Sequence, residues 1–224
     1  MSNKLITLTL VALFSACNLG WSDADQLFVS SREGDHGKVK ELLARGVDVN
    51  HRFIHLQRDF QPYETALIVA AEKGHLDIVK TLVKAGAKLE MINTYSSETA
   101  LYKAVKNRHK KVIDYLLKVG SDPMVKDSPE GTDCLMLAVI QNDYKLIKKL
   151  VAYGAWPDPT HRTGRLIKGE VGRTAISIAK ALRRPYVGYL KAQKARCNRV
   201  LKSKTSCATK KVARLKEKNT ALDF

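Results

Sequence analysis

Two closely spaced histidines are the first residues of this sequence whose types and spacing could support chemistry. His51 and His55 are four positions apart, so both rings could reach one metal ion from a single helical turn. No third ligand follows nearby, and no cysteine spacing matches a zinc site. The sequence also contains no nucleophile elbow, phosphate-binding loop, dinucleotide-binding fingerprint or paired carboxylates. We therefore predict a chain that is not an enzyme and that holds no cofactor or metal ion.

Cys17 ends an N-terminal segment that predicts export and the attachment of lipid. Lys4 precedes the apolar run 5–14 (LITLTLVALF), which is too short to span a bilayer and suits the core of a signal peptide. Residues 13–17 (LFSAC) resemble a bacterial lipobox, although Phe14 replaces the aliphatic residue that is usual there. In a lipobox the cysteine is lipidated and becomes the new N-terminus.

This pattern sets the expected processing and location. We predict a lipoprotein-type signal peptide over residues 1–22, with Cys17 as the lipidated residue. Asn18 gives no inner-membrane retention signal of the aspartate type, so we expect a periplasmic protein anchored to the outer membrane. Cleavage near Cys17, Ser22 or Ala24 would instead release a soluble exported protein. A buried N-terminal helix is the third interpretation.

The other three cysteines have structural interpretations. Cys134 lies inside a repeated unit, where we expect a buried thiol. Cys197 and Cys207 are ten positions apart, and an oxidising compartment would allow them to form a disulfide.

The positive charge is concentrated at the C-terminal end. The chain of 224 residues has a net charge of +17, and from His161 onwards 18 lysines and arginines face 3 acidic residues. We predict a basic C-terminal extension over residues 195–224, helical or disordered. It could be a solvated tail, contact anionic phospholipid head groups or meet an acidic patch of a partner. Nucleic acid is not expected for an exported protein.

A repeated unit makes up the chain between the signal peptide and the basic extension. Each copy opens with a leucine and closes with a glycine nineteen positions later, in the pairs Leu27 and Gly46, Leu67 and Gly86, Leu101 and Gly120, and Leu135 and Gly154. Apolar residues at helical spacing precede each glycine, which can provide a left-handed helix end. Gly34, Gly74, Arg108 and Asn142 mark the turn between two helices. A period near 33 residues predicts stacked helix–turn–helix units.

The repeats resemble the ankyrin family. The segment TALIVAAEKGHLDIVKTLVKAGA, which begins at Thr65, follows the family pattern and departs from it at Ala66 and Ile68. The resemblance implies an all-α ankyrin-repeat solenoid over residues 23–194, with four to five helix–turn–helix repeats and β-turn fingers. The repeats are expected at about 25–50, 65–90, 99–123 and 133–158, with a degenerate cap at 174–194.

Two insertions between repeats and the concave face supply the candidate contacts. The insertions cover residues 51–63 and 156–171 and would enlarge the fingers. Aromatic and arginine side chains there suit a protein interface, although they could instead fold back over the stack. The candidate partner-binding residues are Phe53, Arg58, Phe60, Tyr63, Glu72, Lys73, Tyr95, Lys103, Lys106, Asn107, Gln141, Trp156, Arg162 and Arg165.

The resemblance implies a binding protein, because repeats of this kind build extended surfaces for other macromolecules. We expect a folded protein partner. Small exported ankyrin proteins of this kind resemble immunity proteins against interbacterial toxins, such as phospholipase effectors of type VI secretion, which they would block at the active site. One alternative is a periplasmic scaffold or chaperone for a resident envelope enzyme. Another is an envelope protein that binds anionic lipid.

Overall fold

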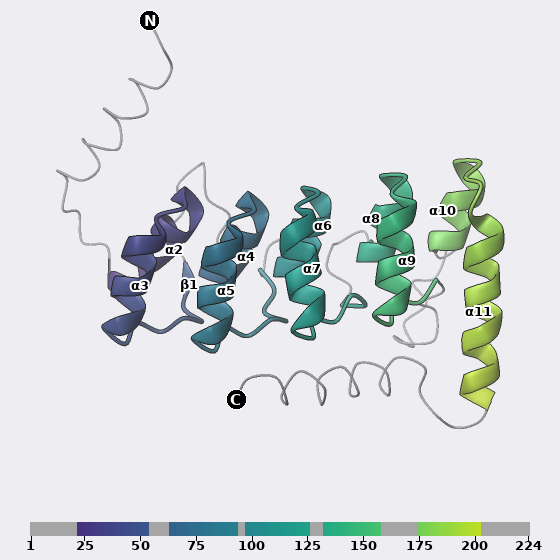
Figure 1. The fold of residues 1–224 in the computed structure, drawn as a ribbon. Coiled ribbons are helices and arrows are strands. Elements are labelled where there is room, and N and C mark those ends of the chain that lie inside the picture. Colours follow the sequence, from purple (N-terminus) through teal and green to yellow (C-terminus); the bar gives the residue numbers. More distant parts are fainter. Residues whose placement is uncertain (1–21, 54–62, 94–96, 126–131, 158–173, 203–224) are drawn as a thin grey trace, which may run out of the picture.

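Helix pairs stack side by side in one row along the molecule (Figure 1). The computed structural model describes residues 22–53, 63–93, 97–125, 132–157 and 174–202. The elements are α2 (Asp23–Glu33), α3 (His36–Ala44), β1 (Arg52–Phe53), β2 (Glu64–Thr65), α4 (Ala66–Lys73), α5 (Leu76–Lys84), α6 (Ala100–Lys106), α7 (Lys110–Lys118), α8 (Cys134–Ile140), α9 (Tyr144–Ala152), α10 (Ala175–Ala181) and α11 (Val187–Lys202). The predicted all-α repeat solenoid is confirmed.

The first helix of each repeat begins at a side-chain cap. In four repeats the capping oxygen accepts a hydrogen bond from the backbone N–H three residues later, and the caps are Thr65, Thr99, Asp133 and Thr174. In the first repeat the cap is Ser22, which forms a reciprocal capping box with Asp25. The acidic residues Asp23 and Asp25 lie in the first turn of α2. Such caps satisfy N–H groups that have no partner within the helix.

Left-handed residues end both helices of a repeat. The predicted closing glycines Gly46, Gly86, Gly120 and Gly154 all have φ between 81° and 102°. The turn between the two helices uses the same conformation, at Gly34, Gly74, Arg108, Asn142 and Arg183. The turn positions that the sequence indicated in the first four repeats are therefore confirmed, and Arg183 extends the series into the fifth.

The core runs continuously through the stack. The repeat leucines Leu27, Leu67, Leu101 and Leu135 are at most 1% exposed, and they belong to one hydrophobic cluster. Cys134 is part of the same cluster and is buried, as predicted. Because the first helices of neighbouring repeats pack against one another, each repeat depends on the next for its stability.

The finger between the first two repeats starts as a short antiparallel ladder. Strands β1 and β2 pair in the register Arg52 to Thr65 and Phe53 to Glu64. At the other end of the stack, α11 continues past residue 194 and ends at Lys202. Within the described ranges, no helix is long and apolar enough to cross a membrane.

Candidate protein-binding surface

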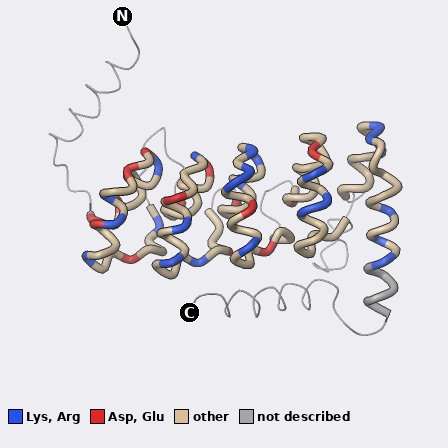
Figure 2. The backbone as a smooth tube through the Cα atoms, viewed as in Figure 1, with Lys and Arg blue, Asp and Glu red and all other residues tan. Residues whose placement is uncertain are grey.

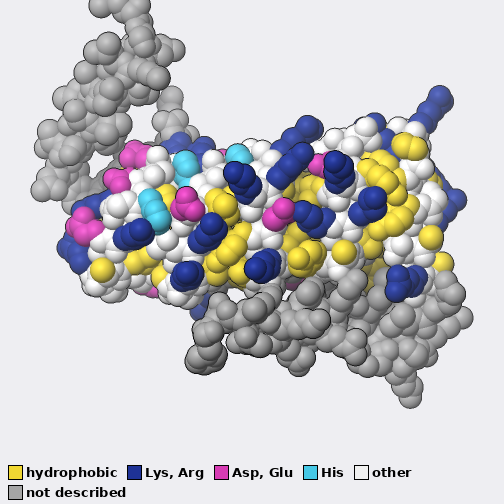
Figure 3. All heavy atoms as spheres, viewed as in Figure 1, with side chains coloured by type: hydrophobic (Ala, Val, Ile, Leu, Met, Phe, Trp, Pro, Cys, Tyr) yellow, Lys and Arg dark blue, Asp and Glu magenta, His cyan; other side chains and the backbone are white. Residues whose placement is uncertain are grey.

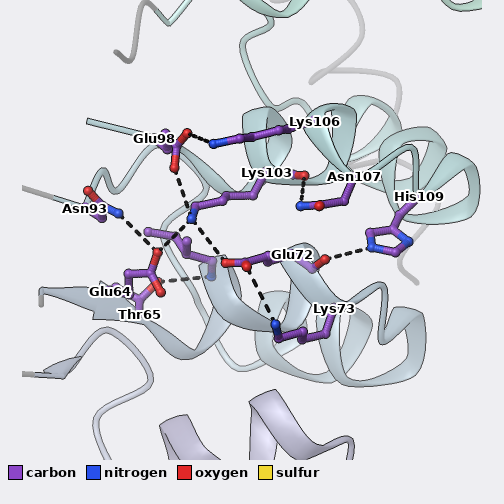
Figure 4. Close-up of polar contacts among 11 residues, drawn as sticks. Glu64, Thr65, Glu72, Lys73, Asn93, Glu98, Lys103, Lys106, Asn107 and His109 are labelled. Atoms are coloured by element: carbon purple, nitrogen blue, oxygen red, sulfur yellow. Dashed lines mark hydrogen bonds and ion pairs between the residues drawn. The ribbon is translucent and has the colours of Figure 1, made fainter. Parts of the chain in front are cut away.

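A buried lysine organises the polar side chains between the second and third repeats (Figure 4). Lys103 Nζ lies 3.1 Å from an oxygen of Glu64, 3.1 Å from one of Glu72 and 3.0 Å from one of Glu98. Asn93 also donates a hydrogen bond to Glu64, at 3.1 Å. Only 5% of the Lys103 side chain is exposed, so this cation is held almost entirely by protein groups. We call these five residues the Lys103 cluster.

The repeat pattern explains how the cluster forms. Glu64 and Glu98 occupy equivalent positions, 34 residues apart, each directly before the threonine that caps the first helix of its repeat. Lys103 stands where the neighbouring repeats have Val69 and Leu137. A position that is otherwise apolar therefore carries an ammonium group in the third repeat, and carboxylates from two repeats meet it.

Burial and charge act in opposite directions on this lysine. Burial alone would lower the pKa of Lys103, but the nearby Glu64, Glu98 and Glu72 carboxylates outweigh it and raise the pKa. Burial raises the pKa of Glu64, and Lys103 opposes that rise. A buried charge that lost these partners would be costly. The cluster therefore fixes the second repeat against the third.

Exposed groups surround the cluster and remain available for contacts. Lys106 binds Glu98 at 2.8 Å, and 53% of its side chain is exposed. Lys73, next to Glu72, is 39% exposed. The exposed Asn107 donates a hydrogen bond to the Lys103 carbonyl, so its backbone and side chain are held in place. Such groups can meet a partner without first being ordered.

Gln141 extends this surface to the fourth repeat. Its amide donates hydrogen bonds to the carbonyls of Val105, at 2.8 Å, and Lys106, at 3.2 Å. Of the residues predicted for the concave face, Glu72, Lys73, Lys106, Asn107 and Gln141 therefore lie along neighbouring repeats as partly or fully exposed groups. We call these five residues the groove residues.

Three of the predicted contact residues are buried instead. Phe53 has 0% exposure and stacks on Phe28 with ring centroids 4.3 Å apart, so the outward position expected of it is wrong. Trp156 is 9% exposed, and its backbone N–H points at the Met124 sulfur, 2.9 Å away. Lys103 is the third, for the reasons above. These three residues therefore lie beneath the surface and do not offer their side chains for contact with a partner.

Tyr63 is the aromatic finger residue that the structure places outside. It is 41% exposed, and its backbone N–H donates to the Phe53 carbonyl at 2.6 Å. Its φ of 67° is left-handed, which turns the chain at the end of the insertion.

The remaining predicted residues are not covered by the structure. Arg58, Phe60, Tyr95, Arg162, Arg165, Cys17 and Cys207 lie outside the described residues. Cys197 is in α11, but its side chain is not described, so the predicted disulfide stays a prediction. His51 lies 3.4 Å from Asp25, and His55 is outside the described ranges. Within those ranges, no group of three or more His, Cys, Asp or Glu side chains could hold a metal ion.

Sequence reasoning missed the carboxylates that hold Lys103. A signal for them does exist, because the tetrapeptide Glu-Thr-Ala-Leu occurs at both 64–67 and 98–101. A lysine at an apolar position of the repeat, combined with a repeated acidic residue, would have predicted a buried ion pair. Asn93 has no comparable sequence signal.

Comparison with known proteins agrees with the fold. Residues 27–127 match the profile of ankyrin repeats in three copies, and the helix pairs beyond residue 127 continue the same arrangement. A segment of 65 residues is 40% identical to histone-lysine N-methyltransferase EHMT1 from Mus musculus, and likewise to EHMT1 from Homo sapiens. The matched segment covers 29% of this chain and 5% of each methyltransferase.

The class of protein follows from the repeats. The chain contains ankyrin repeats, which are typically non-catalytic modules for protein–protein interaction. The likeness to the methyltransferases lies in the repeat region alone and carries no methyl-transfer chemistry to this chain.

Proposed function

We propose that this chain binds one folded protein through the groove residues and the enlarged fingers. The observation that carries the proposal is that the exposed side chains of Lys73, Lys106 and Asn107 lie beside the buried Lys103 cluster. Because the cluster fixes the second repeat against the third, these side chains present hydrogen-bond donors in a fixed arrangement. Their mixed chemistry, with Glu72 and Gln141 beside them, suits a folded protein better than a polyanion, which would favour a continuous basic stripe.

The partner that we propose is an exported bacterial toxin, such as a phospholipase effector of type VI secretion. The leader pattern of residues 1–22, with Cys17 as the proposed lipidated residue, supports a periplasmic position at the outer membrane. An immunity protein at that position would meet the toxin before the toxin reaches the bilayer. It would act by covering the mouth of the active site, which requires a rigid surface and no chemistry of its own.

Affinity capture tests this proposal. The full chain, with a C-terminal tag and its own N-terminus, is expressed in a bacterium and recovered from the envelope, and bound proteins are identified by mass spectrometry. A stoichiometric toxin whose activity falls when the chain binds would support the immunity function. A resident envelope enzyme whose activity is retained or increased would favour a scaffold or chaperone instead.

Capture of lipid instead of a protein is the third possible outcome of this experiment. If the chain retains anionic lipid but no protein, and deletion of residues 195–224 removes that lipid, the basic extension is the functional element. High salt separates these cases, because screening weakens binding through exposed charges more than it weakens a packed protein interface.

A further inference from the structure

Positive charge increases along the solenoid (Figure 2). The described residues from 22 to 93 contain 9 lysines and arginines and 10 aspartates and glutamates. From 97 to 194 the described residues contain 14 lysines and arginines and 5 aspartates and glutamates. The last three repeats therefore form a strongly basic half of the described stack, separate from the C-terminal extension.

Large apolar side chains are exposed at the turns of this basic half. Ile140, at the end of α8, is 48% exposed; Tyr144, at the start of α9, is 40% exposed; and Leu182, after α10, is 44% exposed. Leu182 occupies the repeat position of Gln141, whose amide reaches the carbonyls of the preceding repeat. This equivalence places Leu182 beside the end of α8. We call Ile140, Tyr144 and Leu182 the turn-edge patch.

Contacts between the fourth and fifth repeats hold the turn-edge patch in place. The Tyr186 hydroxyl donates to the Val139 carbonyl at 3.0 Å, and Arg184 donates to the Ile140 carbonyl at 3.5 Å. The Tyr144 ring stacks on Tyr186 with centroids 5.6 Å apart. These hydrogen bonds from the fifth repeat satisfy the Val139 and Ile140 carbonyls. The turn is therefore fixed, while the apolar side chains of the patch stay exposed.

Basic side chains border the patch. Lys148 Nζ lies 4.6 Å from the centre of the Tyr144 ring, and Lys145, Lys180 and Arg183 are exposed on the same turns and the adjoining helices. The nearby Asp143 is used as the cap of α9, where it accepts from the Leu146 N–H at 2.9 Å. In the space-filling view, lysine, arginine and apolar side chains adjoin one another over this part of the stack (Figure 3).

The composition of this surface suits a membrane. Membrane-surface segments combine leucine and aromatic residues with lysine and arginine, and tyrosine lies well at the level of the head groups. Each basic residue near an anionic leaflet adds attraction.

We propose that the turn-edge patch and its basic border dock on the surface of an anionic phospholipid bilayer. Ile140 occupies the repeat position of Lys106, and Leu182 that of Asn107 and Gln141, so the patch continues the row of groove residues into the last two repeats. It is distinct from the C-terminal extension. It would hold the last two repeats against the membrane.

Vesicle partition of the full chain tests the proposal. Partition is measured on phosphatidylcholine vesicles that contain phosphatidylglycerol and on vesicles of phosphatidylcholine alone. The difference between the two partition coefficients isolates the contribution of the anionic lipid, because any insertion of residues 5–14 occurs in both kinds of vesicle. We expect Lys148→Glu to reduce this difference about fivefold or more. The matched control is Lys80→Glu, the same charge change at the same repeat position in the near-neutral half, which should have a much smaller effect.

A second variant tests the apolar contribution. Ile140→Ser combined with Leu182→Ser should weaken partition about fivefold or more, with Tyr63→Ser as the control for an exposed apolar residue elsewhere. Thermal unfolding confirms that each variant is folded. Equal partition of Lys148→Glu and Lys80→Glu would overturn the proposal. If the patch variants leave vesicle partition unchanged but weaken capture of a protein, the patch is a protein interface and the membrane proposal is wrong. Since the vesicles contain no protein, this result does not depend on whether the groove binds a toxin.

Discussion

The imidazole ring of His109 lies against the α-carbon of Gly74, one repeat earlier. His109 Nε2 donates to the Glu72 carbonyl at 2.7 Å, and a Cβ added to Gly74 would be 2.5 Å from His109 Nδ1. His75 has the same relationship to Gly34, with its Nε2 bonded to the Arg32 carbonyl at 3.0 Å. Glycine is therefore favoured at these two turns by its φ and is needed there for space.

Replacement of Gly74 by alanine should expose both requirements. We expect Gly74→Ala to lower the free energy of unfolding by about 1–2 kcal/mol for the left-handed backbone, and by about 1–3 kcal/mol more for the overlap with His109. Gly86→Ala is the matched control, because Gly86 has φ of 90° and nothing within 4 Å of the added Cβ. Urea unfolding measures both.

A double-mutant cycle isolates the overlap. In a His109→Ala background the ring is absent, so the effect of Gly74→Ala should fall to that of Gly86→Ala. If Gly74→Ala and Gly86→Ala cost the same with His109 present, the close approach has no energetic consequence and the explanation fails.

At the same turn of the next repeat, a change from Arg108 to glycine should alter the stability in the opposite direction. It has φ of 61°, and the residue that corresponds to His109 in the following repeat is Asp143. Glycine would relieve the backbone strain, so we expect Arg108→Gly to stabilise the protein by about 0.5–1 kcal/mol. Lys110→Gly, within α7, should instead destabilise it by up to about 1 kcal/mol. Thermal or urea unfolding distinguishes the two, and a loss of stability in Arg108→Gly would contradict the prediction.

The Lys103 cluster predicts a change in the pH dependence of stability. A raised pKa means that the folded protein holds the proton more tightly, so the stability contributed by Lys103 is lost only as the pH rises through its raised value. Glu64 also has a raised pKa, and its contribution to stability falls as the pH rises above 4.5. Lys103 opposes that rise, so Lys103→Met should raise the pKa of Glu64 further.

Urea unfolding of Lys103→Met at about pH 5 and about pH 8 measures this effect. We expect a loss of about 3–5 kcal/mol near neutral pH, with stability falling more steeply towards the higher pH than in the parent chain. Lys103→Met combined with Glu64→Gln should reduce that slope and provides a second variant if the single one does not fold. Equal slopes in the parent chain and Lys103→Met would refute the assigned electrostatics.

The two aromatic residues at the base of the first finger should differ in their effects. Phe53 is fully buried against Phe28, so Phe53→Ala should cost about 3–5 kcal/mol. Tyr63 is 41% exposed, and Tyr63→Ala should change stability by less than about 0.5 kcal/mol. Calorimetry of the two variants measures this. A small effect of Phe53→Ala would show that this residue is not part of the interior and would restore it as a candidate contact.

The sequence was sufficient for the repeats because their constraints are local. Leu67 and Gly86 fix the two ends of one unit, and the cap at Thr65 and the turn at Gly74 lie at set distances between them. The burial of Phe53 could not be predicted in this way, because its stacking partner Phe28 lies in the preceding repeat.

The candidate surface was only partly predictable for a related reason. Gln141 and Lys106 occupy positions that we expected on the concave face, and both side chains are at least partly exposed here. Lys103 was expected on the same concave face, but carboxylates from two repeats hold it inside. Whether a polar side chain is exposed or buried depends on partners that the repeat pattern alone does not specify.

The dissociation constant of the captured protein partner tests the central claim most directly. The full chain is compared with the groove variant Lys106→Ala/Asn107→Ala and with the control Lys84→Ala/Lys88→Ala, whose residues are exposed outside the groove residues. We expect the groove variant to bind about tenfold more weakly or worse and the control to bind as the parent chain does, with both variants equally stable. Equal affinities for all three chains would contradict the claim that the groove residues bind the partner.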